Sequence, residues 1–179
     1  MREEVFLAGT GGQGVLSAGQ MLAQVAMEAD YQVSYLPLYS PEVRGGTATA
    51  TIVFSDEAVG SPVLGTAGAL VLFAGRSVDD ELHRARPGGL VVSNVSSTGH
   101  IELPQYIRLV EVPATEIATE LGFEQVTNMV MLGAYIAAAD VLGLERFEQA
   151  LRSVLPERHH KHIPLNMEAL KRGADCARG

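Results

Sequence analysis

Three glycines near the N-terminus, Gly9, Gly11 and Gly14, have the G-x-G-x-x-G spacing. An apolar, strand-like run (4–8) precedes them, and apolar residues recur at helical spacing from Val15 onward. Glycine permits positive φ angles and a close approach of ligand to backbone, and the N–H groups at a helix start favour an anion. The pattern predicts that a phosphate-bearing ligand binds the whole loop, Gly9, Thr10, Gly11, Gly12, Gln13 and Gly14. The alternative is a tight strand–helix turn that binds nothing.

A second glycine-containing loop occurs at Tyr39–Gly46, with the sequence YSPEVRGG. Arg44 is the only basic residue between Arg2 and Arg76, and Gly45 and Gly46 follow it directly. A guanidinium suits a diphosphate or a carboxylate, and two glycines let the chain pass close to a ligand. We therefore predict that Arg44, Gly45 and Gly46 contribute to the same ligand site. The alternative is a local surface ion pair between Glu42 and Arg44.

The region after the second predicted strand disfavours NAD(P). A NAD site usually has an acidic residue about 20 positions beyond the glycine loop, which holds the ribose. Ser34 and Tyr35 occupy that region, and no arginine lies there to bind a 2′-phosphate. A dinucleotide-binding reductase is thus the weaker interpretation.

The elements that must position these loops alternate between strand and helix patterns. Strands are expected at 4–8, 32–36, 47–54, 70–74, 90–95 and 106–112. Helices are expected from 15 to about 29, and at 79–85, 113–121, 128–142, 144–154 and from about 166. An irregular loop is expected at 37–46. Asp79–Glu81 is expected to form the acidic first turn of a helix. The order predicts a single-domain α/β fold over residues 1–179, with a mostly parallel sheet, a Rossmann-like start and helices on both faces.

Composition narrows the function classes. The net charge of −8 and the lack of a basic stripe disfavour nucleic-acid binding. No apolar run is long enough for a bilayer span and the N-terminus has no signal-peptide pattern, so a cytoplasmic protein without a membrane partner is expected. The single cysteine, Cys176, cannot ligate an iron–sulfur cluster or form an internal disulfide. We predict no catalytic residue and no metal site in this chain.

The two glycine loops, GTGGQGV (9–15) and YSPEVRGGTA (39–48), together resemble the gamma subunit of 2-oxoacid:ferredoxin oxidoreductases. The segments NMVMLG (128–133) and 162–170 are also similar, so the resemblance covers nearly the whole chain. Two positions depart from the family pattern: Ala67-Gly68 before a middle strand, and Phe73-Ala74-Gly75 after it. Both lie away from the glycine loops along the chain, so they bear on local detail more than on the family.

The resemblance implies a multisubunit enzyme that oxidatively decarboxylates a 2-oxoacid, forms an acyl-coenzyme A and reduces ferredoxin. Thiamine diphosphate, Mg and the iron–sulfur clusters would belong to partner subunits (alpha, beta and a ferredoxin-like delta). This chain would help to close the active site and bind coenzyme A as co-substrate, with no cofactor of its own. The second loop favours a 2-oxoglutarate or branched-chain oxoacid type over pyruvate. An indolepyruvate oxidoreductase small subunit, a free-standing dinucleotide-binding reductase and an interaction-only module remain the alternatives.

The segment Glu157–His162 contains His159, His160 and His162 beside Lys161. Adjacent histidines point in different directions, and no carboxylate or cysteine has a suitable spacing for a metal. A solvated helix cap or a subunit contact is the preferred interpretation. Asn128 is expected to cap the apolar helix that follows it.

Overall fold

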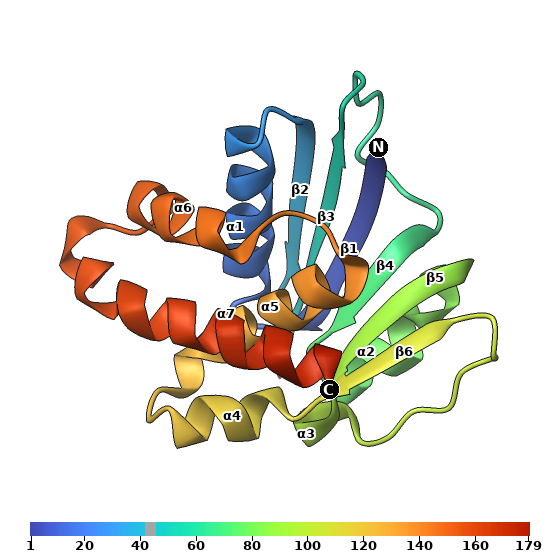
Figure 1. The fold of residues 1–179 in the computed structure, drawn as a ribbon. Coiled ribbons are helices and arrows are strands. Elements are labelled where there is room, and N and C mark those ends of the chain that lie inside the picture. The colour runs from blue at the N-terminus through green and yellow to red at the C-terminus, as the bar shows by residue number, and fades with distance from the viewer. Residues whose placement is uncertain (42–45) are drawn as a thin grey trace.

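The computed structural model describes residues 1–41 and 46–179, and these build one six-stranded sheet in the order β2-β3-β1-β4-β5-β6 (Figure 1). The pairs β1–β4, β4–β5 and β5–β6 are parallel, and β3 is antiparallel to both β1 and β2. The predicted α/β fold is therefore confirmed, with a mixed, mostly parallel sheet. The strands are β1 (Arg2–Thr10), β2 (Gln32–Ser40), β3 (Thr47–Ser55), β4 (Ala67–Leu72), β5 (Ala85–Asn94) and β6 (Arg108–Val112).

Helices cover both faces of this sheet, as predicted. The α-helices are α1 (Val15–Glu28), α2 (Gly75–Glu81), α3 (Val95–Thr98), α4 (Ala114–Glu120), α5 (Thr127–Ala139), α6 (Phe147–Val154) and α7 (Ile163–Arg178). Short 3-10 turns are η1 (Leu82–Arg84), η2 (Glu124–Val126), η3 (Leu144–Arg146) and η4 (Glu157–His162). Across the described ranges, no helix is both long and apolar enough to cross a membrane.

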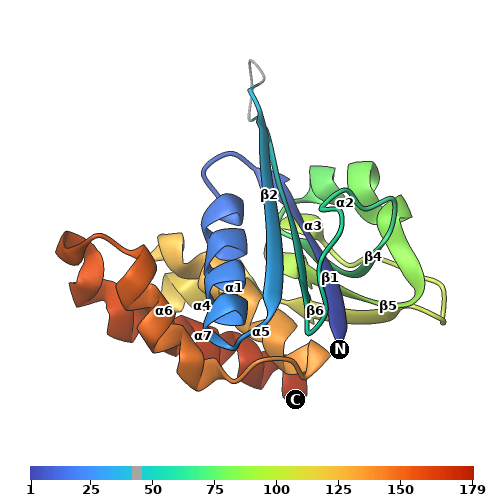
Figure 2. The ribbon, with the colours of Figure 1, turned by 90° about the horizontal axis from the view of Figure 1, so that it is seen from above.

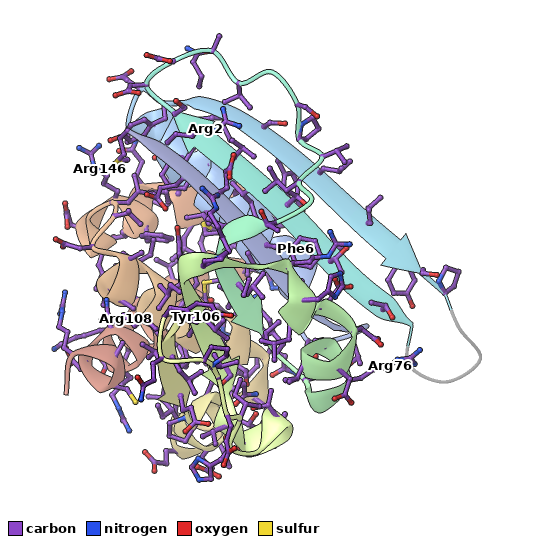
Figure 3. All side chains as sticks on the ribbon, turned by 90° about the vertical axis from the view of Figure 1, so that its right-hand side faces the viewer. Arg2, Phe6, Arg76, Tyr106, Arg108 and Arg146 are labelled. Atoms are coloured by element: carbon purple, nitrogen blue, oxygen red, sulfur yellow. The ribbon has the colours of Figure 1, made fainter. Side chains whose placement is uncertain are left out.

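The two faces form two apolar clusters because successive strand residues point to opposite sides. Helices α1, α5, α6 and α7 lie over one face, and α2 and α3 over the other (Figure 2). In β1, Val5 and Leu7 belong to the first, larger cluster. Phe6, labelled in Figure 3, belongs to the second cluster. The Arg84 guanidinium lies 4.8 Å from the centre of the Phe6 ring.

The segment after α1 differs from the prediction. Residues 37–40, expected in an irregular loop, extend β2, which pairs with β3 from Gln32↔Ser55 to Ser40↔Thr47. Pro37 does not end the strand because β2 lies at the sheet edge, where a missing N–H is tolerated. The second glycine loop thus lies between the strands of a hairpin and does not follow a βα unit. Its residues Arg44 and Gly45 lie outside the described residues.

Helix α2 also differs from the prediction. It spans Gly75–Glu81, directly after β4, whereas the sequence predicted 79–85. Asp79–Glu81 therefore forms the last turn of α2. The prediction that these acidic residues form the first turn of a helix and complement its dipole is wrong. Two of the three carboxylates instead have arginine partners: Asp80 lies 3.5 Å from Arg76 Nε, and Glu81 pairs with Arg84.

Helices α5 and α7 approach each other closely through glycines. A Cβ at Gly133 would overlap the Leu170 carbonyl, and one at Gly173 would overlap the Val130 carbonyl. Only a glycine leaves room for backbone at this distance. The small residues within 128–142 thus allow a close contact between two helices of this chain. The helix predicted to reach residue 142 ends at Ala139, because Asp140 takes a left-handed conformation (φ 54°).

Candidate functional site

The first glycine loop connects β1, a central strand, to α1, as its spacing predicted. Gly12 and Gly14 have φ angles of 89° and 73°, which side chains with a Cβ rarely adopt. Gly11 and Gly12 are exposed, and a Cβ at Gly12 would meet nothing within 4 Å. The turn is therefore open at Gly12, in front of the helix N-terminus.

Backbone N–H groups are available on the helix side of this turn. The amide of Ala18 donates to Gly14 O at 2.9 Å. The N–H groups of residues 15–17 precede that bond and have no carbonyl within the helix to bond, as at any helix N-terminus. Together with the positive end of the helix dipole they favour an anion. The local chemistry suits a phosphate group near Gly12 and Gly14.

The two glycine segments predicted to share a site are brought together at Gly46. Gly11 N–H donates to Gly46 O at 2.7 Å. The Tyr39 ring, at the end of β2, is 3.2 Å from the position of a Gly11 Cβ. A pocket of about 420 Å³ lies between the loop and the hairpin, lined by residues that include Gly11, Gly12 and Tyr39. The described part of the hairpin thus forms one wall of the candidate anion site.

Gln13 holds the loop to the neighbouring strand. Its side-chain Oε1 accepts from Thr10 N–H at 2.8 Å, and its Nε2 donates to Phe73 O at 3.3 Å, just past β4. The sequence suggested a polar contact to ligand from this amide. In the structure both of its ends are engaged within the chain, so its role is to support the loop.

Asn94, which the sequence analysis did not single out, joins four segments behind the loop. Its Nδ2 donates to Phe73 O (3.4 Å), Ser97 Oγ (3.3 Å) and Thr115 Oγ1 (3.0 Å), and its Oδ1 accepts from Ala114 N–H (3.1 Å). The residue is 1% exposed. Asn94 lies at the carboxyl end of β5, and this position could have indicated a functional residue in the sequence, since ligand sites of parallel sheets gather at that edge.

We expect Asn94→Ala to lower the free energy of unfolding by roughly 2 kcal/mol, because it leaves buried polar groups such as Ala114 N–H without a partner. Urea denaturation of the purified chain measures this change. A Thr119→Ala variant, which removes an exposed hydroxyl bonded to its own helix, is the control. Equal stability of the Asn94 and Thr119 variants would contradict a structural role for Asn94.

A second pocket adjoins the other side of the loop. It has a volume of about 360 Å³ and is lined by Gly12, Gln13 and a set of mostly uncharged polar residues: Ser97, Thr115, Glu124, Gln125 and Thr127. Its hydroxyl and amide groups suit the hydrogen-bonding groups of a neutral ligand segment. Its Glu124 carboxylate disfavours a phosphate.

Asn128 contacts the glycine loop and does not cap α5. The N-cap position is Val126, without a side-chain cap bond, and Asn128 lies in the first helical turn. Its Nδ2 donates to Gly14 O at 3.2 Å and lies 2.6 Å from where a Gly14 Cβ would be. The predicted cap is therefore wrong, because the turn η2 starts the helix earlier and directs this amide at the loop.

Tyr35, at the place where a NAD site would have its acid, fixes α1 to the hairpin. Its hydroxyl donates to Leu16 O at 2.8 Å, and burial raises the pKa of this phenol. The group is therefore engaged in the fold. No ribose-binding carboxylate stands at this position.

The histidine segment forms η4 and leads into α7. Within residues 1–41 and 46–179, no group of three histidine, cysteine, aspartate or glutamate side chains could hold a metal ion. His160 Nε2 bonds to Leu155 O at 2.8 Å, while His162 stacks on Phe123 with ring centres 5.2 Å apart. The rings of His159 and His162 lie near each other, with centres 6.3 Å apart, whereas His160 is engaged separately by its bond to Leu155 O.

Sequence comparison assigns a family. A family model described as pyruvate ferredoxin/flavodoxin oxidoreductase matches residues 4–176. Subunit VorA of ketoisovalerate oxidoreductase from Methanothermobacter marburgensis is 40% identical over 97% of this chain and 36% of VorA, so the chain spans about a third of that relative's length. Subunit KorC of 2-oxoglutarate synthase from Methanothermobacter thermautotrophicus is 32% identical over 87% of this chain and 86% of KorC. Indolepyruvate oxidoreductase subunit IorB from Pyrococcus horikoshii is more distant, at 26% identity over 97% of this chain and 95% of IorB.

Solved structures agree with this assignment. The gamma subunit of a keto/oxoacid ferredoxin oxidoreductase from Geobacter sulfurreducens superposes with a TM-score of 0.82 at 26% identity, covering 98% of each chain. The 2-oxoglutarate:ferredoxin oxidoreductase from Magnetococcus marinus, solved with 2-oxoglutarate, coenzyme A and succinyl-CoA bound, has a TM-score of 0.89 at 22% identity, over 99% of this chain and 31% of its own. That second likeness concerns the fold alone. This chain belongs to the pyruvate ferredoxin/flavodoxin oxidoreductase family, and its fold is that of the gamma subunit.

Proposed function

We propose that residues 1–179 act as one gamma-type unit of a 2-oxoacid:ferredoxin oxidoreductase and that their glycine loop binds the diphosphate of coenzyme A. The observation that carries the proposal is the meeting of the two glycine segments, where Gly11 N–H bonds to Gly46 O beside the open turn at Gly12. An exposed helix N-terminus with glycines in front of it is suited to a diphosphate. Gly9, Thr10, Gly11, Gly12, Gln13, Gly14 and Gly46 would form or support this site, with Arg44 and Gly45 as the further predicted residues.

The relatives support a choice of oxoacid. Ketoisovalerate is a branched-chain oxoacid, and the relatives at 40% and 32% identity are subunits of a ketoisovalerate oxidoreductase and a 2-oxoglutarate synthase. We infer that the enzyme oxidises a branched-chain oxoacid or 2-oxoglutarate. Electrons would pass to ferredoxin, and the acyl group to coenzyme A.

The surface of the hairpin supports a heteromeric enzyme. Leu38 and Tyr39 are each 56% exposed, and Val63, which lines the same pocket of about 520 Å³, is 74% exposed. Exposed apolar groups beside a site are typical of a surface that a partner covers. Alpha, beta and ferredoxin-like delta subunits would supply thiamine diphosphate, magnesium and iron–sulfur clusters. This chain would contribute the coenzyme A site and no catalytic residue.

The test uses an affinity-tagged chain purified from its own organism with its bound subunits. We expect the complex to reduce methyl viologen only when a 2-oxoacid and coenzyme A are both present, with 2-oxoisovalerate or 2-oxoglutarate preferred over pyruvate and indolepyruvate. Calorimetric titration of the same complex with coenzyme A and NADPH completes the experiment. Binding of NADPH without binding of coenzyme A would instead favour the dinucleotide-binding reductase.

A further inference from the structure

Asn128 joins the first turn of α5 to the last residue of the glycine loop. Its side-chain Nδ2 donates to Gly14 O at 3.2 Å, and the residue is 7% exposed. The same carbonyl accepts from Ala18 N–H at 2.9 Å, at the start of α1. Two donors, one from each helix, therefore fix the direction of the Gly14 carbonyl.

The direction of this carbonyl sets the direction of the N–H group that follows it. A peptide unit is planar and trans, so its C=O and N–H bonds point in opposite directions. Because the Gly14 carbonyl points toward Ala18 N–H and Asn128 Nδ2, the Val15 N–H points out of the amino end of α1. Gly14 has a φ of 73°, and a Cβ on it would lie 2.6 Å from Asn128 Nδ2. A glycine at this position therefore gives both the turn and the room for the amide.

The Val15 N–H is a donor without a partner in the fold. Within residues 1–41 and 46–179, no acceptor is bonded to it. Val15 is 1% exposed, so this group is withdrawn from bulk water, and a buried N–H without an acceptor costs free energy. Val15 also lines the pocket of about 420 Å³ that contains Gly12. An oxygen atom of a ligand in that pocket would complete the missing hydrogen bond.

We propose that Asn128 is a positioning residue of the enzyme, which directs the Val15 N–H at an anionic oxygen of the bound ligand and does not itself contact that ligand. The inference rests on the proposed function, in which the anion is the diphosphate of coenzyme A. Helix α5 is suited to this role because residues 128–136 are all buried, so packing holds the helix in place behind the loop. The role requires a carboxamide, since a carboxylate at position 128 could only accept and would oppose the Gly14 carbonyl.

The test compares Asn128→Ala and Asn128→Asp in the complete purified enzyme, by steady-state kinetics and by calorimetric titration with coenzyme A. The alanine variant loses one hydrogen bond, so its KM and Kd for coenzyme A should rise about three- to tenfold. The aspartate variant has nearly the same shape as the wild type but repels the Gly14 carbonyl, so both constants should rise further, by at least about tenfold. The KM for the 2-oxoacid should be unchanged in both variants, which separates a local effect from a general one.

The matched control is Asn166→Ala, which removes another amide-to-carbonyl bond, from Asn166 Nδ2 to His162 O at 2.8 Å, outside the pocket that Val15 lines. It should change neither KM. If Asn128 only filled space against Gly14, the aspartate variant would bind coenzyme A more tightly than the alanine variant. That order, or an unchanged Kd in the alanine variant, would overturn the inference. The alanine variant alone decides the matter if the aspartate variant does not assemble.

A charge placed at Gly12 distinguishes failure of this inference from failure of the proposed function. A raised KM for coenzyme A in a Gly12→Asp enzyme, together with normal Asn128 variants, would overturn only the positioning role of Asn128. An unchanged KM in the Gly12→Asp enzyme would overturn the anion site and, with it, the role of Asn128.

Discussion

Gly12→Asp is expected to raise the KM for coenzyme A of the assembled enzyme by about tenfold or more, with little change in stability relative to Gly12→Asn. A residue with a Cβ is strained at φ 89°, but aspartate and asparagine share this strain, and a Cβ there meets nothing within 4 Å. Only aspartate adds a negative charge next to the proposed diphosphate site. Two unit charges about 4 Å apart near a protein surface repel by roughly 4 kcal/mol, and about a third of that suffices for a tenfold effect.

The Gly12→Asn variant is the control, since it has the same shape without the charge. Steady-state KM values for coenzyme A and for the 2-oxoacid separate a local effect from a general one. An equal increase in the coenzyme A KM for both variants would indicate a steric or structural role for the turn. An unchanged KM in the aspartate variant would exclude an anion at Gly12.

Gly173→Ala is expected to lower the free energy of unfolding by about 3 kcal/mol, although alanine is the better helix former. Gly173 lies in the interior of α7, and its Cβ would overlap the Val130 carbonyl of α5. Two helix backbones would have to separate, which also disturbs the contact at Gly133. For a chain of this size the midpoint of thermal unfolding should fall by roughly 10 °C.

Gly60→Ala is the matched control, because Gly60 is exposed and its Cβ would meet nothing within 4 Å. Thermal unfolding followed by circular dichroism compares the three proteins. A Gly173→Ala chain as stable as the Gly60→Ala chain would show that α5 and α7 separate at no cost, contrary to the packing described above.

Local patterns predicted the elements that depend on local physics. The strand–glycine–helix unit around Gly9–Gly14 was predictable because positive φ angles and apolar periodicity leave direct marks in the sequence. The apolar strands β3 and β4 were located to within a few residues for the same reason. The start of α2 was missed because no polar cap precedes it: its N-cap is Ala74, without a side-chain cap bond. The acidic residues that seemed to begin the helix lie at its end.

The pairing of strands and the use of polar side chains required the folded chain. Pro37 seemed to end a strand, and only the edge position of β2 makes it acceptable. Asn94 and Asn128 have no sequence signal of their own, because their partners, Phe73 O and Gly14 O, lie 21 and 114 residues away along the chain.

The sequence by itself determined the α/β class, the family and the glycine turn that opens at Gly12, since each depends on residue type and on short spacings. Tertiary structure alone decided that Gly46 meets Gly11 and that α5 and α7 touch through glycines. The physical reason is that contacts between distant segments depend on how the sheet orders its strands and how the helices pack on it. No short stretch of the chain specifies either of these.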